Sequence, residues 1–75
     1  MIKLYSAGIS AERRSGGVVV STCAVTANSK AEAVGLAIEF AENRWPKNEH
    51  YSHQAAVFEI PQYLIDAVNS EGDNV

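Results

Sequence analysis

One segment of the chain, residues 29–45 with the sequence SKAEAVGLAIEFAENRW, carries signals for both ends of a helix. Ser29 is followed three residues later by Glu32, the spacing of a capping box, in which each side chain satisfies a free backbone N–H of the first turn. Pro46 lacks an N–H and disfavours helical geometry in the residue before it, so the helix should end near Trp45. The other segments are shorter, and we expect them to use this helix as one wall of the core.

This helix carries more apolar surface than one sheet needs. At about 100° per residue, one apolar face comprises Ala31, Val34, Ala37, Ile38, Ala41 and Trp45. Ala33, Leu36 and Phe40 extend the arc along one flank, beyond the stripe of a little over 100° that is typical of a surface helix. We expect Leu36 and Phe40 to be covered by a second partner, either the chain's own C-terminal segment or another protein molecule. Gly35 lies in the middle of this helix, where alanine would stabilise the helix by about 1 kcal/mol relative to glycine. Either the chain tolerates this loss, or the backbone of another segment approaches the helix closely at this point.

Two strands are predicted before this helix. Residues 2–8 alternate in polarity, with Ile2 and Leu4 on one face, and residues 18–26 form a run rich in β-branched side chains. In the second strand, the face that we expect to pack on the helix comprises Val19, Ser21, Cys23 and Val25. Residues 9–17 contain two adjacent glycines and break the alternation, so they are expected to form a loop.

A third strand and a short helix should follow the central helix. Residues 46–52 are polar and form the connection, and residues 53–60 alternate so that Phe58 is expected to face the helix. Pro61 suits the first position of a helix because its backbone angle is fixed near the helical value. The apolar face of this short helix would comprise Tyr63, Leu64, Ile65 and Val68.

The order of these elements constrains the topology of the sheet. The first two strands form an antiparallel hairpin, and the helix carries the chain back so that the third strand can lie beside the first. The sequence therefore predicts an α+β fold: a small three-stranded antiparallel sheet (ββαβ, order 2-1-3) packed on one long helix, with a short C-terminal helix. The strand at 18–26 would form a long apolar edge, poorly protected by charge, which makes it a candidate for pairing between chains.

A chain of 75 residues is close to the size at which a domain buries only about 60% of the surface that its unfolded chain exposes. Residues 1–70 are interpreted as a single domain and residues 71–75 as a disordered tail. Small domains often add disulfides, a metal or oligomerisation, and the single cysteine, Cys23, excludes an internal disulfide. We therefore expect a homo-oligomer, a dimer or larger, and a protein partner.

Charge and hydropathy argue against several function classes. The net charge of -3 and the six Lys and Arg residues argue against a general nucleic-acid binder, because phosphate neutralisation needs clustered basic side chains. No apolar run approaches the roughly 20 residues needed to cross a bilayer, so we expect no membrane partner. The N-terminal sequence MIKLYSAG lacks the apolar region of a signal peptide. We expect a cytoplasmic protein, and the single unpaired thiol agrees with a reducing compartment.

A candidate ligand site comprises Arg13, Arg14, Ser15, Gly16 and Gly17. Two guanidinium groups can each bind a phosphate or carboxylate through paired hydrogen bonds, and adjacent glycines let backbone N–H groups converge on the same anion. The spacing matches neither a Walker loop nor a dinucleotide fingerprint. The alternative is a solvated hairpin loop in which Glu12 neutralises one arginine.

Residues that could support catalysis or metal binding are sparse. His50 and His53 are three apart, so in an extended chain they point to opposite faces, and no further His or Cys cluster completes a zinc site. Cys23 lies among valines, an environment that favours a buried, inert thiol. The serines lack a nucleophile-elbow context, and a chain this small has little room for a closed pocket beside its core. We therefore expect no enzyme activity, no metal and no cofactor.

Our leading hypothesis is a small, non-catalytic interaction protein, a regulator or inhibitor of the phage or mobile-element type, that binds another protein and self-associates. The expected interface residues are Val18, Val20, Leu36, Phe40, Tyr51 and Tyr63. One alternative is an oligomer that binds nucleotides or phosphates through the loop at 13–17. Another is an antitoxin-like regulator that binds DNA as a dimer.

The segment Ala27–Ala33, ANSKAEA, resembles the helix start of small antitoxin domains of the HicB type. The resemblance implies a hairpin strand followed by a capped helix. The further strand that is usual in that family before the helix is missing here, so no function is carried over.

Overall fold

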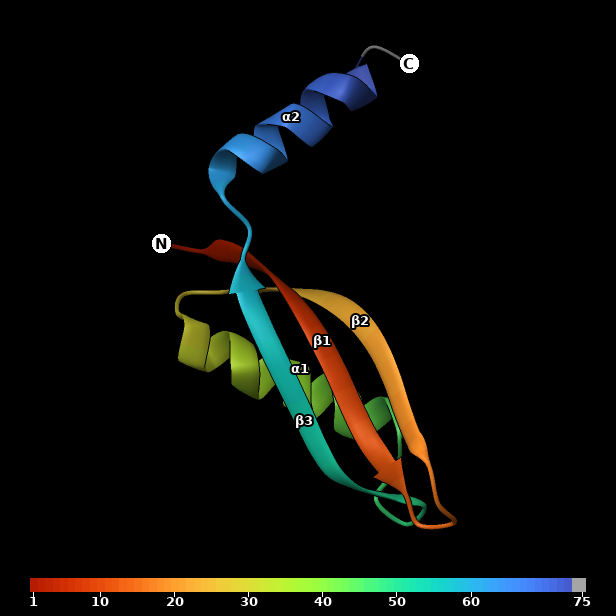
Figure 1. Cartoon of the computed structure of the whole chain (residues 1–75). Helices are drawn as coiled ribbons and strands as arrows, with labels where there is room; N and C mark the ends of the chain where they lie inside the picture. Colours follow the sequence, from red (N-terminus) through yellow and green to blue (C-terminus); the bar gives the residue numbers. More distant parts are fainter. Residues whose placement is uncertain (74–75) are drawn as a thin grey trace.

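The elements follow one another in the order that the sequence predicts, and the structure, a computed structural model, describes residues 1–73. They are β1 Lys3–Arg13, β2 Val18–Ala27, α1 Lys30–Arg44, β3 His50–Glu59 and α2 Gln62–Asp73. β1 lies in the centre of the sheet and pairs antiparallel with both β2 and β3 (Figure 1). The predicted α+β fold with strand order 2-1-3, one long helix and a short C-terminal helix is confirmed.

The capping signals place both ends of α1 as predicted. The Ser29 hydroxyl accepts a hydrogen bond of 3.2 Å from the Glu32 N–H, which satisfies one of the free donors of the first turn. At the other end, the Trp45 N–H donates to the Ala41 carbonyl over 2.8 Å, and Trp45 has left the helical conformation. Pro46 follows immediately and prevents the helix from continuing.

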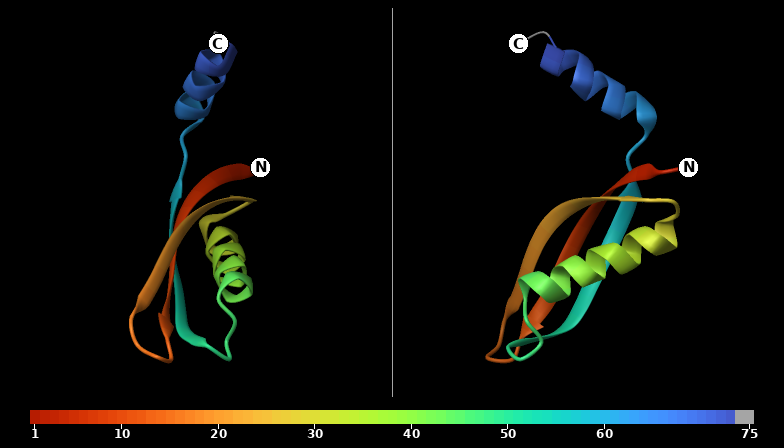
Figure 2. Two further views of the ribbon diagram at one scale, coloured as in Figure 1. Left: turned by 90° about the vertical axis from the view of Figure 1, so that its right-hand side faces the viewer. Right: turned by 180° about the vertical axis from the view of Figure 1, so that it is seen from behind.

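Three alanines one turn apart hold α1 on the sheet. Ala33, Ala37 and Ala41 are fully buried, with no exposed surface, and they pack with a row of side chains from the sheet. This row comprises Tyr5, Ala7, Ile9 and Val57. Because alanine has only a methyl group, the helix axis can lie close to the strands, and α1 crosses one face of the sheet (Figure 2). The predicted buried face is thus partly wrong, since Ala31 is exposed and Ala33 takes its place.

β1 is longer than predicted and continues to Arg13, so most of the expected loop at 9–17 belongs to the sheet. The burial alternation runs on through Ile9 and Ala11, both of which face α1. Only the residues between β1 and β2 form the turn, in which Gly16 and Gly17 adopt φ angles of 104° and 91°. Such angles favour glycine, so the glycine pair marks the turn itself and not the end of the strand.

β3 starts at His50 and contains a bulge near its beginning. Between the pairs Ser10–Gln54 and Glu12–Tyr51, β3 has one residue more than β1, and Ser52 lies there with φ 57°. Beyond the bulge, Val57 pairs with the buried Ala7 and Phe58 pairs with the exposed Ser6. Val57 is therefore buried and Phe58 is 69% exposed, so the prediction that Phe58 faces the helix is wrong.

α2 makes no packing contact with any other described element. It leaves the end of β3 and projects away from the sheet (Figures 1 and 2). The radius of gyration is 14.8 Å, compared with about 11 Å for a compact chain of this length. The alternative in which the C-terminal segment covers Leu36 and Phe40 is therefore wrong. Residues 71–73 of the predicted tail are helical, and residues 74–75 lie outside the described residues.

No helix within residues 1–73 is long and apolar enough to cross a membrane.

The alanine contacts give a matched test of the buried face of α1. Ala37→Leu should lower the free energy of unfolding by about 1–3 kcal/mol, because three more carbon atoms must enter a fully packed contact. Ala31→Leu adds the same atoms at an exposed position and should change the free energy by less than about 0.5 kcal/mol. Urea titrations of both variants measure the difference, and equal losses would contradict the observed orientation of the helix.

Candidate interaction surfaces

The face of the sheet that points away from α1, here called the open face, is not covered by any described element (Figure 2). Its residues are Leu4, Ser6, Gly8, Ser10, Glu12, Val18, Val20, Thr22, Ala24, Thr26, Gln54, Ala56 and Phe58. The charged residue among them, Glu12, lies at the turn end opposite Val18. Serines, threonines and a glutamine are normal on a wet sheet face, but Val18, Val20 and Phe58 are large apolar side chains that are left exposed among them.

The middle of the open face is hollow because its central strand carries only small residues there. In the register of the sheet, Gly8 lies between Thr22 on one side and Ala56 on the other. A depression of about 290 Å³ runs across all three strands at this level, bordered by Val20. A Cβ atom at Gly8 would meet nothing within 4 Å, so the fold of this chain does not require glycine at that position.

A second exposed apolar surface lies on α1. Leu36 is 38% and Phe40 is 45% exposed, and they lie one turn apart on a flank that neither the sheet nor α2 covers. A Cβ atom at Gly35 beside them would also meet nothing within 4 Å. The exposure of these two side chains agrees with the apolar arc that the sequence predicts.

A third apolar surface lies on α2 and at the bend that joins it to the sheet. A groove of about 510 Å³ is lined by Leu4, Ile60, Leu64, Ile65, Val68 and Asn69. Leu64, Ile65 and Val68 form one stripe at helical spacing, whereas Tyr63 lies on the opposite side of the helix and is 70% exposed. The four residues that the sequence grouped together therefore do not form one face.

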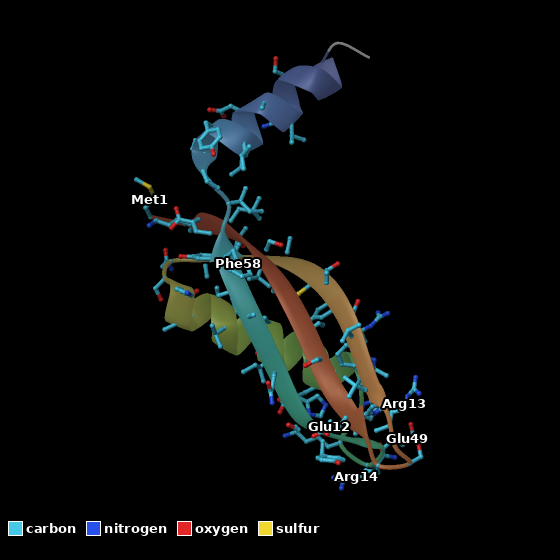
Figure 3. The ribbon with its side chains drawn as sticks, viewed as in Figure 1. Met1, Glu12, Arg13, Arg14, Glu49 and Phe58 are labelled. Carbon is cyan, nitrogen blue, oxygen red and sulfur yellow. The ribbon has the colours of Figure 1, made fainter. Side chains whose placement is uncertain are left out.

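The turn between β1 and β2 meets the connection between α1 and β3 at the far end of the sheet (Figure 3). The Arg14 backbone N–H donates to the Glu49 carbonyl over 2.9 Å, and its side-chain Nε donates to the Lys47 carbonyl over 3.1 Å. The guanidinium carbon also lies 5.6 Å from the centre of the Tyr51 ring, within the range of a cation–π contact. Arg14 thus fastens two loops that are far apart in the sequence.

The predicted anion site borders a hollow of about 400 Å³ lined by Arg13, Arg14, Ser15, Asn48, Glu49 and His50. The Gly16 N–H donates to the Arg13 carbonyl over 3.0 Å, so it serves the turn. Part of the Arg14 side chain serves the loop contact described above, and the acidic Glu49 lines the same hollow. Nucleotide or phosphate binding by this loop stays a prediction, as does DNA binding.

Both histidines donate hydrogen bonds to backbone carbonyl groups at or just after the end of α1, and they do not converge on one point. His53 Nε2 donates to the Trp45 carbonyl over 2.7 Å, and His50 Nδ1 donates to the Pro46 carbonyl over 3.2 Å, since a carbonyl oxygen can only accept. The Trp45 carbonyl belongs to the C-cap of α1, whereas the Pro46 carbonyl also accepts the backbone N–H groups of Glu49 and His50 over 3.1 and 2.9 Å. Among the side chains that the structure describes, no group of three or more potential metal ligands is found, and Cys23 is a free, half-buried thiol.

The remaining predicted interface residues lie on different surfaces. Val18 and Val20 are 60% and 75% exposed on the open face, and Tyr51 is 44% exposed at the turn end of the sheet. The positions of Gly8 and Phe58 on the open face were not predicted, because they depend on the pairing of three strands. For Gly8, the sequence contains one indication, an isolated glycine within a strand pattern.

No protein-family model, curated protein or solved structure matches the chain.

The Arg14 contacts predict unequal roles for the two neighbouring arginines. Arg14→Ala should lower the free energy of unfolding by about 0.5–1 kcal/mol, because it removes a hydrogen bond to Lys47 and the contact with Tyr51. Arg13→Ala should lower it by less than about 0.5 kcal/mol. Urea titration measures both, and equal losses would show that the Arg14 contacts do not hold the loops together.

Proposed function

We propose that the protein is a non-catalytic, cytoplasmic regulator that binds another protein through the flank of α1 formed by Gly35, Leu36 and Phe40. The observation that carries this proposal is the exposure of Leu36 and Phe40 in a helix that is already anchored elsewhere. Ala33, Ala37 and Ala41 pack α1 on the sheet, and both ends of the helix are capped. The flank takes no part in these contacts. Two large apolar side chains are therefore left over for an external contact.

Gly35 supports the same conclusion. A glycine inside a helix costs about 1 kcal/mol relative to alanine, and an alanine at this position would meet no atom of the chain's own fold. The cost is offset if the backbone of a partner approaches the helix closely at this point. Gly35, Leu36 and Phe40 together give a shallow surface with two apolar projections.

Charge narrows the chemistry of the partner. Glu32 and Glu39 are exposed on α1 next to Leu36, and the net charge of the chain is -3. The complementary surface has an apolar hollow for Leu36 and Phe40 with Lys or Arg side chains at its rim. Proteins that bind nucleic acids present such basic surfaces, so this protein would act by occupying that surface in competition with the nucleic acid.

A photoreactive residue placed at position 40 tests this assignment in the cell that produces the protein. We expect one cross-linked product with a basic partner protein from position 40, and none from the same group at position 31, which is exposed on another side of α1. Mass spectrometry identifies the product. The same products from both positions, or no product from position 40, would contradict the proposed surface.

Competition with the unlabelled protein adds a matched pair of variants. Leu36→Glu should fail to compete for the cross-linked partner, because it places a charge in the apolar contact. Ala31→Glu adds the same charge and should compete as the wild type does. Ala31→Glu should unfold within about 0.5 kcal/mol of the wild type. Leu36→Glu should lose about 1 kcal/mol, because the Leu36 side chain is 38% exposed and partly packed, and it should still be folded.

A further inference from the structure

We propose that two copies of this chain form a symmetric dimer in which α2 of each copy packs across the open face of the other. This assembly is separate from the flank of α1 and does not depend on the function proposed above. The chain supplies one uncovered sheet face and one helix that packs on no other strand or helix among residues 1–73. The open face lacks a covering helix, and α2 lacks a surface on which to pack.

The dimensions of the helix and the sheet agree. α2 has 12 residues and is about 18 Å long and about 10 Å wide. Three strands about 4.8 Å apart span about 10 Å between the outer strands, so one helix covers the width of the open face. The same relation already holds on the other face, where α1 alone covers the sheet (Figure 2).

The surface of the open face also fits a helix. Val20, which is 75% exposed, lines the hollow on the side of β2, and Phe58, which is 69% exposed, lies further along β3 opposite Ser6. Gly8 lies at the bottom of that hollow, although nothing in its own fold requires a glycine there. Glycine inside a strand is typical of sites where another backbone approaches closely. The stripe of Leu64, Ile65 and Val68 supplies apolar side chains to a surface on which Val20 and Phe58 are exposed.

The number of surfaces on each copy defines the assembly. With one helix and one face per copy, a two-fold exchange uses both and leaves no site for a third copy, so growth stops at the dimer. A single helix on a single face would be smaller than the roughly 800 Å² that each partner of a stable complex buries. In the exchange, each copy contributes both a helix and a face, which doubles its buried area.

The path of the chain favours exchange over return to its own sheet. The Ile60 N–H still donates to the Leu4 carbonyl over 2.9 Å, so the sheet continues up to the residue before Pro61. α2 begins at the next residue after Pro61 and runs onward from the sheet (Figure 1). At this bend Leu4 and Ile60 of the sheet line one groove together with the apolar stripe of α2.

Sedimentation or light scattering at several concentrations measures the assembly. We expect twice the chain mass of 8.1 kDa at high concentration and dissociation on dilution. Val68→Glu should weaken the dimer at least tenfold, since it places a charge in the stripe. Tyr63→Glu, on the opposite side of α2, should leave the dissociation constant within twofold of the wild type.

Gly8→Val separates assembly from folding. Valine is favoured in strands, and a Cβ atom at this position meets no atom of the chain within 4 Å, so the variant should be about as stable as the wild type towards urea under conditions where both are monomeric. The added side chain fills the hollow and should weaken the dimer at least tenfold. A dimer that tolerates both Gly8→Val and Val68→Glu would overturn the proposed exchange.

Cysteine pairs distinguish exchange from a helix that folds back on its own sheet. In a Cys23→Ser background, a copy carrying Val68→Cys mixed with a copy carrying Ala56→Cys should form disulfide-linked heterodimers under mild oxidation. If α2 folds back instead, only the double variant becomes oxidised, and it does so as a monomer. That result, or a monomeric wild type at every concentration, would overturn the proposal, whereas cross-linking at position 40 of α1 would be unaffected.

Discussion

The fold depends on the contact between the three alanines of α1 and one face of the sheet. Ala33, Ala37 and Ala41 have no exposed surface, and they bring the helix close enough to bury Tyr5 and Ile9. A sheet has two faces, however, and this chain packs one helix on it. The same contact that builds the core therefore leaves the open face and its large apolar side chains in water.

This imbalance matters for a domain of this size. Folded domains are stable by about 0.05–0.15 kcal/mol per residue, and burying one large apolar side chain contributes about 1.5–3 kcal/mol. Phe58 and Val20, both more than two-thirds exposed, therefore forfeit a substantial fraction of the stability that a chain of 75 residues can reach. Covering the open face would restore it, which is the physical reason to expect a second layer on that side.

Local signals in the sequence were sufficient for the elements and their order, but not for the faces of every strand. The Ser29 cap and Pro46 fix α1 through neighbouring residues alone, so that prediction is confirmed. The orientation of Phe58 depends on the pairing of β3 with β1, in which Phe58 lies opposite Ser6 and Val57 lies opposite the buried Ala7. The exposed flank of α1 could be predicted because it needs only helical periodicity, whereas the open face required the register of three strands.

Hydroxyl-radical footprinting of Phe58 as a function of protein concentration tests the central claim most directly. If the open face is covered in the assembled protein, Phe58 should be protected from oxidation at high concentration and become reactive on dilution. Tyr63, on the outer side of α2, should stay reactive throughout and provides the internal reference. Equal reactivity of Phe58 at every concentration would show that the open face stays in water, and would contradict this account.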